Sequence, residues 1–166
     1  MPDPRLLKHL EHAVTPPSSS SSSVPWPPGP LDRQALLHTY RNVLGWPLTP
    51  GAGPDEPTSV RCTLFDAVVL PHAVGVLCLG EDRGPAVRPA IDIGGERLVF
   101  LTLPGTGHLA VRCGGLVLSG PGDVLRLPPT PGHSWRTPPW DPLRPGPLPL
   151  PLPHGAELFR HAPQDP

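Results

Sequence analysis

One stretch of the chain, DRQALLHTYRNVLGWP at residues 32–47, carries the clearest pattern of local structure. Asp32 is a favoured N-cap residue, because its carboxylate accepts hydrogen bonds from the first unpaired amides of a helix. Gly45 supplies the left-handed conformation that commonly ends a helix, and Trp46-Pro47 cannot continue it. Between these ends the apolar side chains recur at helical spacing: Leu36, Leu37, Tyr40, Val43 and Leu44. The sequence therefore predicts a helix over residues 32–44 with one buried face.

Short apolar runs separated by turn residues follow this helix. Residues 63–70 are largely apolar and β-branched, which predicts a strand, and Pro71 could then open a short helix over residues 72–79. Residues 97–103 and 109–112 flank a Gly-containing turn, a spacing that suits an antiparallel hairpin. These patterns extend the predicted structure from one helix to a small sheet.

Two further apolar runs, residues 116–118 and 124–127, are separated by a turn rich in glycine. Several short strands preceded by one strong helix are typical of an α+β fold. We therefore expect a small, mainly antiparallel sheet with one or more packed helices.

Proline and glycine limit how much of the chain can pack, since 30 Pro and 18 Gly occur among 166 residues. Residues 1–30 are expected to be a marginal helix followed by a flexible Ser/Pro-rich linker. Residues 141–166 form a Pro-rich tail that cannot bury a continuous apolar face. The predicted domain is thus residues 31–140, with disordered Pro-rich ends. The marginal helix, residues 4–14, carries four apolar side chains at helical spacing: Leu6, Leu7, Leu10 and Val14.

The composition argues against several function classes. The net charge is −1 and basic residues are not clustered, whereas strong sequence-independent binding to nucleic acid needs clustered positive charge. Cys62, Cys78 and Cys113 share no metal-type spacing, so we expect reduced thiols rather than zinc ligands or a disulfide framework. No apolar run approaches the length of a membrane span, and the N-terminus lacks a secretory pattern. These features predict a cytoplasmic protein without a membrane partner.

Three segments, in this order, resemble the bifunctional primase/polymerase domain of the archaeo-eukaryotic primase superfamily. The helix that leads into residues 45–51, GWPLTPG, resembles that domain's opening helix and Gly-aromatic-Pro strand. Residues 105–109, GTGHL, are similar to its Gly-Gly-x-His-Leu strand. Residues 122–130, GDVLRLPPT, followed by Trp135, are similar to its Gly-Gly-Tyr element, which ends in Pro-Pro-Ser. The resemblance spans about residues 32–140 and implies a shortened, divergent relative.

The CTLFDA pattern at residues 62–67 also resembles short, divergent bacterial proteins of this domain family. In active members carboxylates bind two divalent metals, and a His contacts the phosphates of the nucleotide. By resemblance Asp66 is the first acid of an Asp-x-Asp pair, but its partner position is Val68. His108 matches the nucleotide-contacting His, and the third acid would fall at residues 117–119, which contain none. The metal site is therefore expected to be incomplete.

Each surviving residue also has a plainer interpretation. Asp66 precedes an apolar run and can be a turn-forming carboxylate, and Asp123 beside Gly122 can be another. His108 follows a glycine turn, where a partly exposed structural His is common. Asp92 could be a substitute ligand, but its polar-apolar alternation before two glycines indicates the solvent side of a hairpin. The sequence also lacks a P-loop and a Gly-x-Ser-x-Gly elbow.

Three functions remain open from the sequence. The first is a degenerate primase/polymerase-like pseudoenzyme that binds a nucleotide or a single strand weakly through His108, Arg112 and Arg126. It has no assigned catalytic residue, since Asp66 and His108 are only vestigial candidates. No cofactor is expected, except a divalent metal if a residual site survives. The second is a protein-interaction module, in which the Pro-Leu repeat of residues 147–153 adopts polyproline II and docks into an aromatic groove. The third is an unrelated enzyme whose acids meet only in the folded chain.

Overall fold

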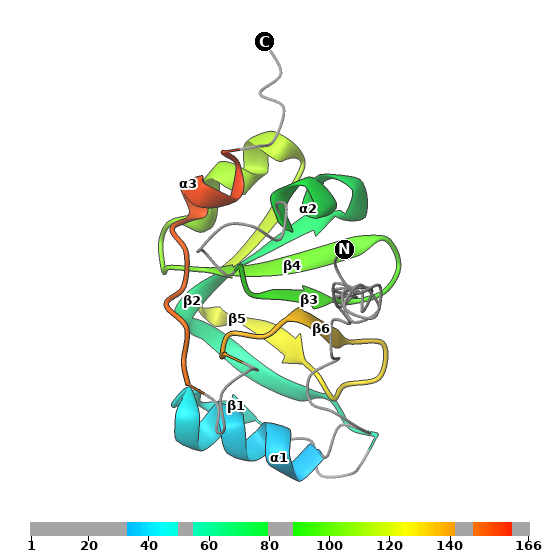
Figure 1. The fold of residues 1–166 in the computed structure, drawn as a ribbon, viewed down its shortest axis with the longest axis vertical. Helices are drawn as coiled ribbons and strands as arrows, with labels where there is room; N and C mark the ends of the chain where they lie inside the picture. Colours follow the sequence, from blue (N-terminus) through cyan, green and yellow to red (C-terminus); the bar gives the residue numbers. More distant parts are fainter. Residues whose placement is uncertain (1–32, 50–54, 80–87, 142–147, 161–166) are drawn as a thin grey trace, which may run out of the picture.

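The structure, a computed structural model, describes residues 33–49, 55–79, 88–141 and 148–160. It shows short helices packed against an antiparallel sheet, which confirms the predicted α+β class (Figure 1). The predicted N-cap Asp32 and the expected helix and linker of residues 1–30 lie outside the described residues.

The elements follow one another in the order α1 (Arg33–His38), η1 (Thr39–Val43, a π-helical turn), β1 (Leu48–Thr49), β2 (Thr58–Pro71), α2 (His72–Leu79), β3 (Ala90–Asp92), β4 (Arg97–Thr102), η2 (Gly107–Cys113, a 3₁₀ helix), β5 (Leu116–Leu127), β6 (Ser134–Thr137) and α3 (Gly155–Leu158). The predicted strand at 63–70 and the short helix at 72–79 are thus both present, as β2 and α2.

β2 organises the sheet. It pairs with β1 through residues 59–60, with β4 through residues 66–71 and with β5 along most of its length, always antiparallel. Some residues of β2 pair with β5 and also with β1 or β4, so β5 lies along the other edge of β2 from these two strands. β3 and β6 continue beyond β4, which gives the strand order β1-β2-β4-β3-β6 with β5 across β2.

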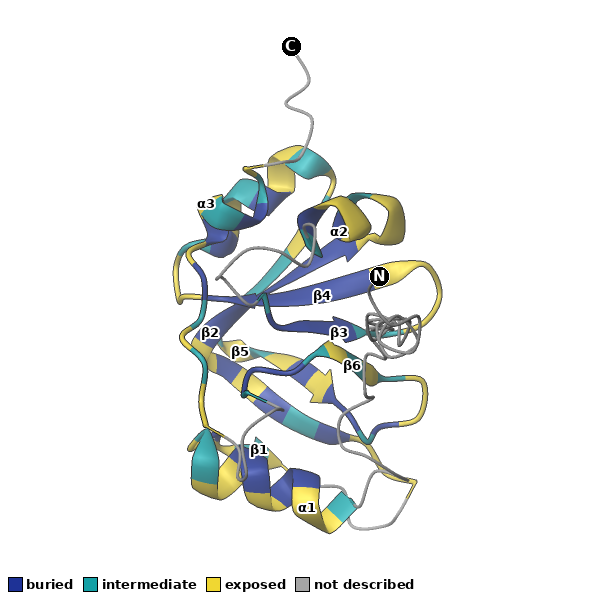
Figure 2. Cartoon of the chain, viewed as in Figure 1, coloured by how far each residue is buried: buried dark blue, intermediate teal, exposed yellow. Residues whose placement is uncertain are grey.

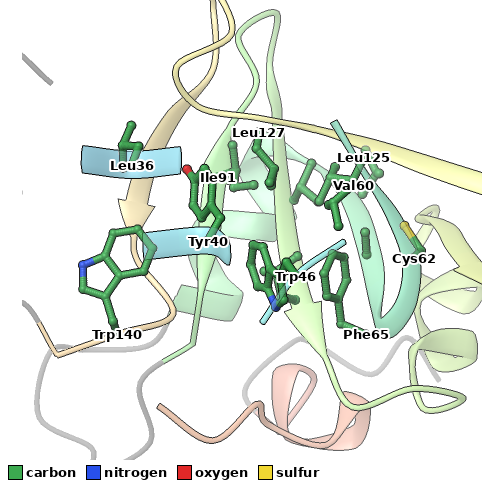
Figure 3. Close-up of a cluster of buried hydrophobic side chains, with 14 residues drawn as sticks. Leu36, Tyr40, Trp46, Val60, Cys62, Phe65, Ile91, Leu125, Leu127 and Trp140 are labelled. Carbon is green, nitrogen blue, oxygen red and sulfur yellow. The ribbon is translucent and has the colours of Figure 1, made fainter. Parts of the chain in front are cut away.

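α1 and η1 cover one face of the sheet and confirm the predicted helix from residue 33 to 43. Gly45 ends it in the left-handed region at φ +66°. The buried Tyr40 stacks on Trp46 at 5.6 Å between ring centroids, and its hydroxyl donates to the Pro128 carbonyl and accepts from Trp135 Nε1, each at 2.7 Å. Burial raises the pKa of Tyr40 far above its usual value, so the phenol stays neutral. Figure 3 shows the Tyr40 and Trp46 rings among the buried side chains of this core.

The opposite face is covered over the second half of β2 by α2, η2 and α3. Side chains alternate between the faces along β4, where Val99 and Leu101 join the α1 side and Leu98 and Phe100 the other. The second core contains Val68, Leu70, Cys78, Ala90, Leu98, Phe100, Ala110 and Leu158. The second half of β2 is therefore buried on both faces, which explains its continuous apolar sequence.

Two strand predictions differ from the structure. The expected second hairpin strand at residues 109–112 is wrong, because residues 107–113 form the helix η2. Residues 116–118 and 124–127 belong to one strand, β5, rather than to two separate strands. Asp92 does lie at a hairpin, between β3 and β4, where its Oδ1 accepts a hydrogen bond from the Gly94 amide at 2.9 Å.

Packed chain continues beyond the predicted boundary at residue 140. Leu158 of α3 is fully buried, and Leu152 packs against the α1-side core. The Leu103 amide donates to the Pro153 carbonyl at 2.9 Å. Residues 148–160 are thus part of the domain, although their prolines suggested a tail. Within the described ranges, no helix is long and apolar enough to cross a membrane.

Candidate functional site

The candidate residues lie around a break in the pairing of β2 with β5. Cys62 pairs with Gly120 and Ala67 pairs with Leu118, so residues 63–66 of β2 stand opposite Ser119 alone. This bulge shifts the alternation: Val60 and Cys62 face the α1 side before it, and Phe65, Ala67 and Val69 face that side after it. Ser59 and Arg61 before the bulge, and Asp66 and Val68 after it, therefore lie on the opposite face.

Asp66 lies at this break and is 2% exposed. Its Oδ2 accepts a hydrogen bond from the Gly107 amide at 2.9 Å, and its Oδ1 accepts from Ser119 Oγ at 2.7 Å. Burial alone would raise the pKa of Asp66, but hydrogen bonds from the Ser119 hydroxyl and the amides of residues 105–107 lower it below its usual value. Asp66 is thus an ionised carboxylate that fixes the start of η2.

The Gly105-Thr106-Gly107 loop is held tightly over Asp66. A Cβ at Gly107 would lie 3.0 Å from Asp66 Cβ and 3.0 Å from Val68 Cγ2, so only glycine fits without movement. Thr106 Oγ1 donates to the Leu103 carbonyl at 2.7 Å and accepts from the Gly155 amide at 2.8 Å. The loop is therefore fixed from below by β2 and from above by α3.

His108 directly follows Gly107, whose amide bonds Asp66, but the side chains of His108 and Asp66 have different surroundings. His108 is exposed, and its Nδ1 lies 3.2 Å from the Gly105 carbonyl oxygen. Arg112 is also exposed, at the far end of η2. Because Gly107 lies against Asp66 and Gly115 lies against Leu70, η2 carries Arg112 away from the break.

Arg126 lies on the other side of the break. It stands opposite Ser59 in the pairing of β5 with β2, and its side chain is exposed. The three nucleotide-binding candidates are therefore spread along β2, with Arg126 near its start, His108 near Asp66 and Arg112 toward its end. They do not form one cluster.

A second arginine, Arg61, accompanies Arg126 on the same face. Arg61 stands opposite Val124, so Arg61 and Arg126 are diagonal neighbours on adjacent strands, with backbones roughly 7–8 Å apart. Arg61 Nη1 donates to the Pro121 carbonyl at 2.8 Å and remains exposed. We call this face, formed by residues 59–61 and 124–126, the open half of the sheet. The covered half is the same face at residues 66–70 of β2, beneath α2, η2 and α3.

The acids near the break are engaged in internal hydrogen bonds. Asp123 Oδ2 accepts from the Ser119 amide at 2.7 Å, and Ser119 itself bonds Asp66. Ser119 thus occupies the region where the resemblance places a third acid, and Val68 is fully buried. Within the described parts of the chain, no group of three or more His, Cys, Asp or Glu side chains is arranged to hold a metal ion.

Cys62 is the thiol closest to this region, and it faces the α1-side core. Burial raises its pKa to about 11, with further contributions from the charges of Asp123 and Asp66. A thiol that stays protonated at neutral pH is a poor nucleophile. All three cysteines are free.

Sequence reasoning singled out Asp66, His108 and Arg126 but missed Arg61 and Ser119. Arg61 could have been recognised from the sequence, because it lies between Val60 and Cys62 in a strand. The period-two alternation of a strand places its side chain on the face away from those two buried residues. Ser119 had none, since its contact with Asp66 depends on how β5 pairs with β2.

No protein-family model, curated protein or solved structure matches this chain. The resemblance to primase/polymerase domains therefore rests on the sequence motifs alone.

Proposed function

We propose that this domain binds a phosphate-bearing ligand, a nucleotide or a single nucleic-acid strand, on the open half of its sheet. The observation that carries the proposal is the juxtaposition of Arg61 and Arg126, both exposed, on adjacent strands of one face that no described helix covers. Two guanidinium groups on rigid strands repel each other when unliganded, and an anion between them would relieve that repulsion. The exposed Val124 beside them offers an apolar surface to a base or sugar.

The proposed binding is weak and depends on salt. Among the described residues, two arginines, Arg61 and Arg126, lie on the open half, and the net charge of the chain is −1. For a single strand, two phosphate contacts correspond to a slope of about −1.4 in a plot of log K against log salt concentration. His108, at the border of the open half, is a third candidate contact to the ligand.

We also propose that the domain descends from a primase/polymerase domain and does not polymerise nucleotides. Two-metal catalysis of nucleotide polymerisation requires several carboxylates that are free to bind the metal ions. Both oxygens of Asp66 already accept hydrogen bonds, while Val68 and Ser119 occupy the positions of the other acids. The proposed setting is the cytoplasm, which agrees with three free thiols.

Fluorescence anisotropy with a labelled single strand, together with calorimetry with nucleoside triphosphates, tests the binding. Arg61→Ser and Arg126→Ser should each weaken binding and reduce the salt slope by about 0.7 for the strand. Arg136→Ser is the matched control, because Arg136 is an exposed arginine on β6, outside the open half. Absence of binding at millimolar ligand, or equal losses in all three variants, would overturn the proposal.

A primer-synthesis assay with Mg²⁺ or Mn²⁺ tests the proposed inactivity separately. We expect no extension above a no-enzyme control. Robust synthesis that Asp66→Asn abolishes would contradict the proposed inactivity.

The alternative of a protein-interaction module built on the Pro-Leu repeat has less support. Pro153 is buried and its carbonyl accepts from Leu103, while Leu152 packs against the core. A partner groove would have to compete with these contacts. Substitution of the exposed Leu148 and Pro151 followed by comparison of co-purified proteins tests this alternative without removing the buried Leu158. Identical sets of proteins would exclude it.

A further inference from the structure

α2 exposes an apolar face that the described parts of the domain leave uncovered. Ala73, Val76 and Leu77 are exposed, Val76 to 46% and Leu77 to 49%. Figure 2 shows exposed residues along α2. We call these three side chains the outer face of α2. Their i, i+3, i+4 spacing puts them on one side of the helix, which is the arrangement that packs against another helix.

The opposite side of α2 already has its partner. Gly75 approaches β4 so closely that a Cβ there would lie 2.9 Å from Leu98 Cβ, and Cys78 is fully buried. α2 is therefore apolar on both sides, a pattern expected of a helix buried all round. In the described part of the chain, no element packs on the outer face.

We propose that residues 4–14 of the same chain dock on the outer face of α2 as a short amphipathic helix. Leu6, Leu7 and Leu10 would lie on Val76 and Leu77, and the polar Arg5, Lys8 and Glu11 would face the solvent. A helix of this length is marginal on its own in water, so it needs such a surface. This inference is independent of the proposed ligand site, because α2 lies over the covered half of the sheet.

The chain length supports an intramolecular contact. Residues 15–32 join the segment to α1 and can span up to roughly 60 Å. A domain of this size has a radius of gyration of only about 13 Å, so the outer face is within reach. The Ser/Pro-rich sequence of residues 15–32 predicts a flexible tether, and such a tether gives an effective concentration in the millimolar range, at which a small apolar contact suffices.

The size of the patch disfavours a second copy as its cover. A stable dimer buries about 800 Å² on each partner. The outer face consists of three side chains, of which the larger two are about half exposed. It matches the width of one short helix.

Hydrogen exchange followed by mass spectrometry on the full chain tests the proposal. A Leu6→Ser/Leu10→Ser variant should reduce the protection of residues 4–14 by about tenfold or more, and should increase exchange in α2. Lys8→Ser is the matched control and should leave exchange unchanged. The reciprocal Val76→Ser/Leu77→Ser variant should release residues 4–14 in the same way.

Equal exchange of residues 4–14 in the wild type and the double-leucine variant would overturn the proposal. Protection that rises with protein concentration would also overturn it, in favour of a second copy. The double-leucine variant leaves every described core residue unchanged, so it remains decisive even if the α2 variant fails to fold.

Discussion

The two halves of β2 differ in what covers them, and the difference explains their sequences. Before the bulge only one face is buried, so buried and more exposed residues alternate from Thr58 to Cys62. After it both faces are buried, and the strand is apolar apart from Asp66. The buried carboxylate lies at the boundary, where it fixes the loop that begins the cover. Stability is thus expected to depend on the covered half, and ligand binding on the open half.

A substitution that weakens the packing of α3 on the covered half should have the largest effect on stability. Leu158→Ala leaves a cavity above the covered half, and we expect a loss of about 2–5 kcal/mol in the free energy of unfolding. Leu148→Ala is the matched control, since Leu148 is 48% exposed, and should cost far less. Urea denaturation at pH 7 measures both. Equal losses would show that α3 does not stabilise the covered half.

Neutralising the boundary carboxylate should have the next largest effect. Asn at position 66 has only one acceptor oxygen, so either the Gly107 amide or the Ser119 hydroxyl loses its partner, at a cost of about 1–3 kcal/mol. Asp92→Asn, at the partly exposed β3–β4 hairpin, is the control.

The Asp66→Asn variant should also change how stability depends on pH. The folded-state pKa of Asp66 is lowered, so its contribution to stability is fully present above the unfolded-state pKa of about 3.9. It is lost as the pH falls through the lower, folded-state pKa. Denaturation between pH 7 and pH 2 should therefore show a smaller acid-dependent loss for Asp66→Asn than for the wild type. Parallel curves would contradict this assignment.

A methyl group added at Gly107 tests the close approach of this glycine to Asp66 on β2. In Gly107→Ala the new methyl group meets Asp66, Val68 and Val117 at 3.0–3.1 Å, and we expect a loss of about 1–2 kcal/mol. Gly122→Ala is the control, because a Cβ there meets nothing within 4 Å. Thermal unfolding of both variants gives the comparison, and a larger loss at Gly122 would contradict it.

Local patterns predicted the parts of the fold that local forces determine. The helix of residues 33–43 has its amphipathic stripe and its stop at Gly45 within one segment. η2 was mistaken for a strand because its beginning depends on Asp66, 41 residues earlier in the chain. The packing of residues 148–160 was missed for the same reason, since Leu158 finds its partners only in the folded sheet.

The candidate site was predictable in part. Asp66 was conspicuous as an acid within an apolar run, but its role as a buried acceptor depends on Gly107 and Ser119, which only strand pairing brings close. Arg61 and Arg126 are distant in sequence and become neighbours through the register of β2 and β5. The sequence therefore indicated candidate residues, whereas their contacts and neighbours depend on how the strands pair.

The smallest effect on stability is expected in the open half. Arg126 is an exposed side chain on an uncovered face, so Arg126→Ser should change the free energy of unfolding by no more than about 0.5 kcal/mol. The same substitution should weaken the binding of a phosphate-bearing ligand, because it removes one of two neighbouring guanidinium groups. Denaturation and anisotropy on one preparation measure both quantities. A large loss of stability would show that the open half contributes to the fold and is not a free binding face. Unchanged stability with reduced affinity would separate the two halves of β2, with binding on one side of Asp66 and the stability of the domain on the other.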